Sequence, residues 1–205
     1  MARPGPVGGP CLEKDPYILA EGLALRGGSA PIALASRRTN EDLPRVVAQR
    51  LAGELFASRP ERASKITVVG LAFKGRPETS DLRGSLAFPL IAELKKAVPL
   101  AVLFGFDPAV APDQAVTMGV NAARSIEEAF AGADLVVFQN NNPQFERLSL
   151  FKLAATMAPG GLIYDMWNQF DPDQLILPHG IRYAGLGSWV LLQRSAKAIV
   201  HLVAD

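Results

Sequence analysis

Residues 66–73 read Ile-Thr-Val-Val-Gly-Leu-Ala-Phe, and this stretch decides the fold. It is apolar without alternation and rich in β-branched residues, which is typical of a parallel strand buried on both faces. A helical pattern over residues 85–97 follows it. A buried strand that leads into a helix is the opening of a βαβ unit, so the stretch predicts a parallel sheet covered by helices.

Towards the C-terminus, strand and helix signals alternate as far as residue 187. The further strands are expected over 100–106, 134–138, 162–165 and 181–184, and further helices over 125–131 and 148–157. This alternation predicts an α/β fold with a Rossmann-like, doubly wound parallel sheet. Ligands of such sheets bind outside the carboxyl ends of the strands. The expected functional rim comprises Phe73-Lys74, Asp107, 139–142, 165–168 and 185–188.

Towards the N-terminus, the pattern is helical. Asp15-Pro16 predicts the start of a helix that ends before Gly27-Gly28. Residues 30–56 predict one or two further helices, and Pro44 is expected to begin a new one. The chain is therefore divided into a helical arm (1–61), an α/β domain (62–187) and a C-terminal amphipathic helix (188–205).

Composition excludes several functional classes. The 205 residues carry 21 basic and 20 acidic side chains, and no basic stripe of the kind that binds nucleic acid is present. No run approaches the ~18 apolar residues of a membrane span. Cys11 is the only cysteine, and the Pro- and Gly-rich start lacks the apolar run of a signal peptide. We expect a cytoplasmic protein with no disulfide, no metal site and no membrane contact.

The first motif that carries chemistry is Pro-Gly-Pro-Val-Gly-Gly-Pro-Cys-Leu-Glu-Lys-Asp-Pro-Tyr over residues 4–17. Its glycines let the backbone approach a ligand closely. Cys11 precedes a helix start, whose positive end favours a thiolate, and Lys14 adds positive charge. Asp15 is suited to orienting a water molecule beside the sulfur. The motif favours a reactive cysteine; the alternative is a small buried core residue.

The second motif spans residues 70–85, between the first strand and its helix. A dinucleotide-binding loop would stand here, but the G-x-G-x-x-G spacing is absent. Phe73 beside Lys74 suits a base and an anionic diphosphate. The alternative is a surface loop with an Asp81–Arg83 ion pair.

Together the two motifs resemble the C-terminal part of the UDP-glucose/GDP-mannose dehydrogenase family, especially the branch that oxidises UDP-N-acetylhexosamines. Residues 4–17 match the family's P-G-x-G-V-G-G-x-C-x-x-K-D-P-Y motif with one residue missing after Pro6. Residues 70–87 match its UDP-binding motif, G-L-A-F-K-x-x-x-D-D-x-R-x-S-P-A, with Ser80 and Leu86 as departures.

The resemblance implies an oxidation of the sugar C6 alcohol to a carboxylate with two molecules of NAD. In that scheme Cys11 forms a thiohemiacetal and then a thioester, and Asp15 helps to position the hydrolytic water. Lys14 and Arg83 match positions that contact NAD. The positions that match contacts to the UDP-sugar are Gly5, Val7, Gly8, Phe73 and Lys74.

Other family features have no counterpart in this sequence. The family's NAD-binding domain and its catalytic Lys, Asn and Glu lie upstream of the cysteine motif, where this chain begins, so we expect that the chain alone does not complete the oxidation. No Arg follows the late strand to hold the diphosphate. There, Trp167 is expected to stack on a base or to pack as a rim aromatic. Asn140 to Asn142 stand where a His is common, so UDP affinity is expected to be altered.

Three hypotheses remain open. The chain is the UDP-sugar half of a split or truncated dehydrogenase, a UDP-sugar-binding module without turnover, or a fragment that oligomerises through the helices of residues 30–56. The expected partners are a UDP-sugar and either a second copy of the chain or a separate protein that carries the NAD-binding domain.

Overall fold

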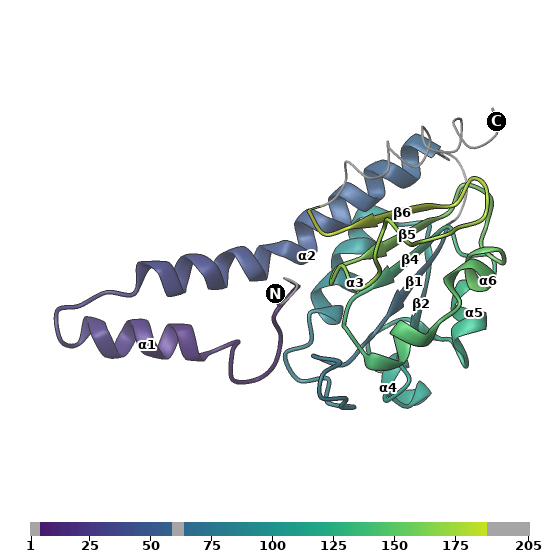
Figure 1. Cartoon of the computed structure of the whole chain (residues 1–205). Helices are drawn as coiled ribbons and strands as arrows, with labels where there is room; N and C mark the ends of the chain where they lie inside the picture. Colours follow the sequence, from purple (N-terminus) through teal and green to yellow (C-terminus); the bar gives the residue numbers. More distant parts are fainter. Residues whose placement is uncertain (1–4, 59–63, 188–205) are drawn as a thin grey trace.

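A helical arm and an α/β domain make up the computed structural model, which describes residues 5–58 and 64–187 (Figure 1). The arm consists of α1 (Asp15–Ala24) and the first half of α2 (Pro31–Ser58), and it projects away from the domain. The second half of α2 lies along the sheet, so one helix belongs to both parts of the molecule.

The domain is built on one parallel sheet of six strands in the order β3-β2-β1-β4-β5-β6. The strands are β1 (Lys65–Val69), β2 (Val102–Phe106), β3 (Asn121–Ala122), β4 (Leu135–Phe138), β5 (Leu162–Asp165) and β6 (Arg182–Gly185). The order reverses between β1 and β4, as in doubly wound dinucleotide-type sheets. The predicted Rossmann-like class is confirmed.

Helices cover both faces of the sheet and create two apolar cores. Ile66 and Val68 of β1 face the core that is closed by α2, by α3 (Ala87–Ala97) and by α4 (Pro112–Thr117). Val69 faces the opposite core, closed by α5 (Ile126–Phe130), the 3₁₀ helix η1 (Pro143–Arg147) and α6 (Leu150–Ala154). The apolar run without alternation follows from this double burial.

The prediction that Pro44 begins a new helix is wrong. Helix α2 continues from Pro31 to Ser58 through Pro44. A proline inside a helix costs one backbone hydrogen bond. After Pro44, Val47, Leu51 and Leu55 are buried in the core, and this packing holds the two halves in one helix.

Two smaller expectations also need correction. Strand β1 ends at Val69, so residues 70–73 belong to the loop, because Gly70 takes a left-handed backbone (φ 86°) that a strand cannot continue. Strand β3 and helix α4 were not expected, since two and six residues are too short to give a periodic signal. The predicted C-terminal helix lies outside the described residues, and the division at residues 61 and 187 stays a prediction.

Candidate functional site

The cysteine loop, residues 5–14, leads into α1 and exposes its sulfur. Cys11 is exposed. Its carbonyl oxygen accepts hydrogen bonds from the backbone N–H groups of Lys14 (3.1 Å) and Asp15 (2.9 Å). These bonds form a turn that continues into α1, so the thiol precedes the helix by one turn. The alternative of a buried core cysteine does not describe this residue.

The strand-end loop, residues 70–86, is anchored by buried polar groups. One carboxylate oxygen of Asp107, after β2, accepts the N–H groups of Leu71 (2.7 Å) and Ala72 (3.0 Å). The Ser85 hydroxyl donates to the Leu71 carbonyl at 2.6 Å. Since both ends of the loop are fixed in this way, the backbone around Phe73 has a defined position at the carboxyl end of β1.

The two loops are in direct contact. The N–H of Gly9 donates to the carbonyl of Gly84 at 2.9 Å. A Cβ on Gly8 would lie 2.6 Å from that same carbonyl oxygen, and one on Gly9 would lie 2.8 Å from the Phe73 ring. The glycines therefore allow a close backbone approach that no other residue permits. The two sequence motifs, more than fifty residues apart in the chain, form one surface.

Four charged side chains near Cys11 form two exposed ion pairs. Lys14 contacts Asp15 at 2.6 Å, and Arg83 contacts Asp81 at 2.8 Å. The pKa of Lys14 is raised, first by its hydrogen bond to Asp15 and least by the charge of Cys11. The pKa of Arg83 is likewise raised, first by Asp81 and least by Cys11. Both cations thus lie within electrostatic range of the sulfur.

The Asp81–Arg83 pair predicts a specific titration. Hydrogen bonds from the side chain and then the backbone of Arg83 lower the pKa of Asp81 to about 2. The folded value lies below the unfolded value of about 3.9, so the pair is complete above pH ~4 and is lost as the pH falls through about 2. Carboxyl NMR should give a midpoint near 2 for Asp81. Arg83→Ala should raise it, but not as far as the unperturbed value of about 3.9, because the backbone N–H of residue 83 still donates to Asp81.

The exposed Arg38, which donates no hydrogen bond to Asp81 among the described residues, provides the matched control for that titration. Arg38→Ala should leave the Asp81 midpoint where it is in the natural chain. A midpoint near 3.9 in the natural chain would contradict the pairing.

Two contacts seat the beginning of the cysteine loop. The Trp167 ring, which follows β5, lies against Gly5 so closely that a Cβ there would overlap it. The indole N–H of Trp167 donates to the Gln139 carbonyl at 2.8 Å. Trp167 therefore packs as a half-buried rim aromatic, with Gly5 against its ring. Two residues further along the loop, Val7 forms two hydrogen bonds with the side-chain amide of Asn40 in α2.

The reversal point between β1 and β4 is closed by the chain itself. The Asn140 side chain covers Gly70, and the backbone of Asn141 and Asn142 covers Gly75, so a Cβ on either glycine would overlap them. Asn140 also donates to the Ala72 carbonyl at 3.2 Å. A dinucleotide diphosphate normally occupies this crevice. The chain therefore packs closely around Gly70 and Gly75 at this point, whereas both predicted NAD contacts, Lys14 and Arg83, are exposed.

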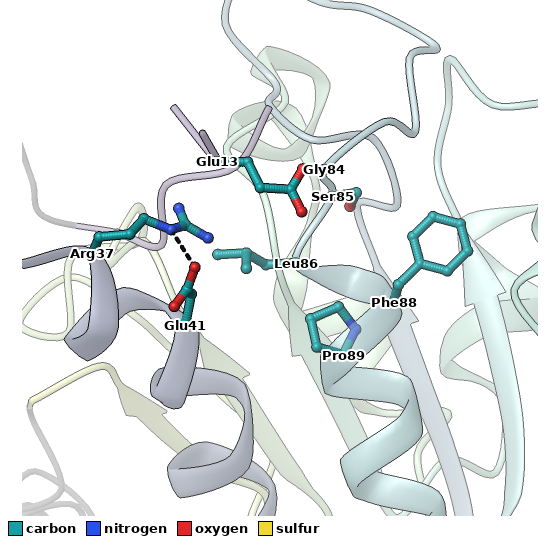
Figure 2. A pocket seen from close by; sticks show the side chains of 8 residues that line it. All are labelled: Glu13, Arg37, Glu41, Gly84, Ser85, Leu86, Phe88 and Pro89. Carbon is teal, nitrogen blue, oxygen red and sulfur yellow. Dashed lines mark hydrogen bonds and ion pairs between the residues drawn. The ribbon is translucent and has the colours of Figure 1, made fainter. Parts of the chain in front are cut away.

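A cavity of about 320 Å³ lies beside the two loops, between α2 and the start of α3 (Figure 2). The Arg37 guanidinium and the Glu13 carboxylate point into it, and Glu41 bonds Arg37 at its edge. None of the predicted site residues lines this cavity. The predicted residues instead line the open surface formed by the two loops.

Residues 5–58 and 64–187 contain neither a cluster of side chains suited to a metal ion nor a helix long and apolar enough to cross a bilayer.

The structure brings most of the predicted residues together. Gly8 contacts Phe73, whose ring lies 5.1 Å from the Lys74 ammonium, and Cys11 lies in electrostatic range of Lys14 and Arg83. Sequence reasoning missed three residues of α2: Arg37 and Asn40, which contact the cysteine loop, and Glu41, which accepts a hydrogen bond from Tyr17 of α1. Their spacing at i, i+3 and i+4 predicts that they share one face of a helix, but it does not predict which segment that face contacts.

Comparisons with known proteins agree with this geometry. Residues 67–172 match the profile described as "UDP-glucose/GDP-mannose dehydrogenase family, UDP binding domain". The chain is similar to the UDP-glucose 6-dehydrogenase of Rhizobium meliloti, with 31% identity over 189 residues that cover 91% of this chain and 41% of that protein.

Solved structures give the same result. The UDP-D-ManNAc dehydrogenase of Pyrococcus horikoshii superposes with a TM-score of 0.69 at 29% identity, over 90% of this chain and 40% of that one. The UDP-N-acetyl-mannosamine dehydrogenase Cap5O of Staphylococcus aureus gives 0.67 at 26% identity, over 93% and 40%. The chain thus spans about two fifths of the length of these proteins.

Proposed function

Because the chain belongs to the UDP-glucose/GDP-mannose dehydrogenase family, we propose that it is the UDP-sugar-binding part of an NAD-dependent UDP-sugar 6-dehydrogenase. One observation carries the proposal: the hydrogen bond from Gly9 to Gly84 joins the loop that bears Cys11 to the loop that bears Phe73 and Lys74. A nucleophile and an anion-binding cation then share one surface, as an oxidation on a bound nucleotide sugar requires.

The strand-end loop supplies the chemistry for the nucleotide. The Lys74 ammonium beside the Phe73 ring pairs a cation for the diphosphate with an apolar face. The backbone of Gly9 lies against the same ring, and the absence of side chains at Gly8 and Gly9 lets the two loops approach each other closely. We assign the UDP-sugar to this surface, with Gly5 and Val7 at its edge.

Cys11 would act as the covalent nucleophile. Its thiolate adds to the C6 aldehyde to give a thiohemiacetal, and loss of a hydride and a proton gives a thioester. Water, oriented by Asp15, attacks the thioester and releases the carboxylate and the thiol. Overall, –CH₂OH, two NAD⁺ and one water give –COO⁻, two NADH and three protons. Lys14 and Arg83 would contact NAD, which supplies the hydride acceptor for both oxidations.

The surface of the arm supports a partner for this part of the enzyme. None of the residues of α1 is buried by the described part of the chain. Leu25 and Ile32, on either side of the turn between α1 and α2, are 80% and 81% exposed. Apolar side chains in such positions are typical of a protein interface. We propose that the arm binds a second copy or the NAD-binding part, in the cytoplasm, where a single free cysteine needs no oxidising compartment.

Reconstitution tests the proposal. The full chain is mixed with the NAD-binding part of the R. meliloti relative, and NAD reduction is followed with UDP-glucose and with UDP-N-acetylglucosamine. The mixture should reduce NAD and the chain alone should not. In parallel, thermal unfolding of the chain alone should show stabilisation of about 2.7 kcal/mol at a ligand concentration of one hundred times Kd. No stabilisation by either UDP-sugar would exclude the proposal.

The matched profile favours a second candidate, because it covers only the UDP-binding domain. A UDP-sugar-binding module without turnover would show the same thermal stabilisation, but no mixture would reduce NAD. Cys11→Ala would then have no consequence for either measurement.

A further inference from the structure

One turn of α2 contacts the cysteine loop at two points and the first turn of α1 at a third. Arg37, Asn40 and Glu41 occupy positions i, i+3 and i+4, which lie on one face of a helix. Their partners are Val7, Leu12 and Tyr17, which precede and follow Cys11 in the chain. The turn therefore holds the backbone on both sides of the sulfur.

Asn40 makes the most specific of these contacts. Its side-chain oxygen accepts the N–H of Val7 at 2.8 Å, and its NH₂ group donates to the carbonyl of Val7 at 2.7 Å. The amide thus satisfies both backbone groups of one residue, as a neighbouring strand would. This fixes the backbone immediately before Gly8, the residue that contacts Gly84 and Phe73.

Arg37 and Glu41 hold the other side of the loop. Arg37 is only 8% exposed, and its Nε donates to Glu41 at 2.8 Å while its Nη1 reaches the Leu12 carbonyl at 3.5 Å. The second oxygen of Glu41 accepts the Tyr17 hydroxyl at 2.8 Å. The pKa of Glu41 is lowered, first by Arg37 and then by Tyr17, so the carboxylate stays charged within this network. Figure 2 shows the Arg37–Glu41 pair beside Glu13.

The loop has few means of fixing itself. Gly5, Gly8 and Gly9 have no side chains and a large conformational entropy when unfolded. Helix α1, which follows the loop, buries no residue within the described chain. Besides the turn that the N–H groups of Lys14 and Asp15 form with Cys11, the contacts from α2, the Gly84 hydrogen bond and Trp167 hold the loop in position.

We propose that Arg37, Asn40 and Glu41 are positioning residues for Cys11, which hold the cysteine loop so that the sulfur faces the sugar of a UDP-sugar bound at Phe73 and Lys74. The proposal rests on the proposed function, because it needs the UDP-sugar to lie on the surface of the two loops. The three residues act through the loop backbone and are not assigned contact with the substrate.

Cys11 provides the readout, because it is the only thiol in the chain. The rate of its alkylation by iodoacetamide is measured on the full chain, with and without UDP-glucose at one hundred times the Kd of each variant. Matching the occupancy in this way removes any effect of weakened affinity. In the natural chain the bound sugar should cover the sulfur and slow alkylation about a hundredfold.

Asn40→Ala should lose at least about tenfold of this protection, since a displacement near 1 Å is enough to uncouple reacting groups. Asn40→Asp keeps the acceptor for the Val7 N–H but loses the donor, so its protection should be intermediate. Thr39→Ala is the matched control: Thr39 is exposed on the same turn and its hydroxyl bonds only the Ala35 carbonyl among the described residues. It should keep full protection. Thermal unfolding of each variant reports whether the fold is intact.

The outcomes separate the two proposals. If UDP-glucose and UDP-N-acetylglucosamine both fail to protect Cys11 in the natural chain, the proposed function is overturned and the positioning role with it. If the natural chain is protected and Asn40→Ala is protected equally, the positioning role alone is overturned. Loss of protection in folded Asn40→Ala, with partial recovery in Asn40→Asp, supports it.

Discussion

Asp165→Ala should destabilise the domain by about 3–5 kcal/mol, a large part of the 5–15 kcal/mol that holds a typical domain together. Asp165 ends β5 and is fully buried. Its carboxylate accepts the backbone N–H groups of Trp167 (2.9 Å), Gln169 (2.6 Å) and Phe170 (3.2 Å), and the Tyr183 hydroxyl at 2.9 Å. Alanine would leave these donors without their acceptor in a half-buried turn.

Urea unfolding measures this effect, with an expected fall in the midpoint of about 2 M. Asp165→Asn keeps the shape but turns an NH₂ group towards the donors, so its loss should be smaller but still evident. Asp173→Ala, at an exposed carboxylate that accepts no hydrogen bond among residues 5–58 and 64–187, should leave the midpoint unchanged. A loss below about 1 kcal/mol for Asp165→Ala would mean that water satisfies the turn.

Cys11→Ala should have the largest effect on activity. In the reconstituted mixture, removal of the nucleophile should lower the rate of carboxylate formation at least ~1,000-fold. The thermal stabilisation of the chain by UDP-glucose should be unchanged, because the thiol is exposed and makes no hydrogen bond within the described residues. The pair of measurements separates chemistry from binding.

Cys11→Ser provides the conservative variant, and it should also be impaired, because a hydroxyl is a much weaker nucleophile at neutral pH. Thr39→Ala serves again as the control, and should keep the rate of the natural chain. Turnover at the natural rate by Cys11→Ala would show that Cys11 is not the nucleophile of the reaction. Absence of turnover in every mixture, the natural chain included, would leave the binding module as the better account.

The sheet could be predicted from the sequence because burial on both faces leaves a clear pattern. Residues 162–165 were assigned to a strand with the bounds that β5 has. The ion pair Asp81–Arg83, named in the alternative interpretation of residues 70–85, is also present, since two residues so close in sequence need no tertiary information to meet. The site motifs were recognisable for the same reason: each is contiguous in the chain.

What the sequence could not predict depends on packing between distant segments. Nothing around Asn40 indicates that its side chain meets Val7, thirty-three residues away, because the approach is set by how α1 folds back on α2. From the sequence, Trp167 could either stack on a base or pack as a rim aromatic, and its contact with Gly5 favours packing. Pro44 reads as a helix break in isolation, and the burial of Val47 and Leu51 after it outweighs that local preference.

Helix α2 has 28 residues and a length of about 42 Å, and it belongs to both the helical arm and the α/β domain. Pro44 has no N–H to donate, so one backbone hydrogen bond of the helix is missing there, and bending of α2 is expected at this position. The cysteine loop is held on both sides of Pro44. Asn40, in the half of α2 before Pro44, bonds Val7. Gly84, in the α/β domain against which the second half of α2 packs, bonds Gly9. Bending of the arm about Pro44 therefore changes the distance between Asn40 and Gly84, and the position of the sulfur depends on the angle between the two halves of α2.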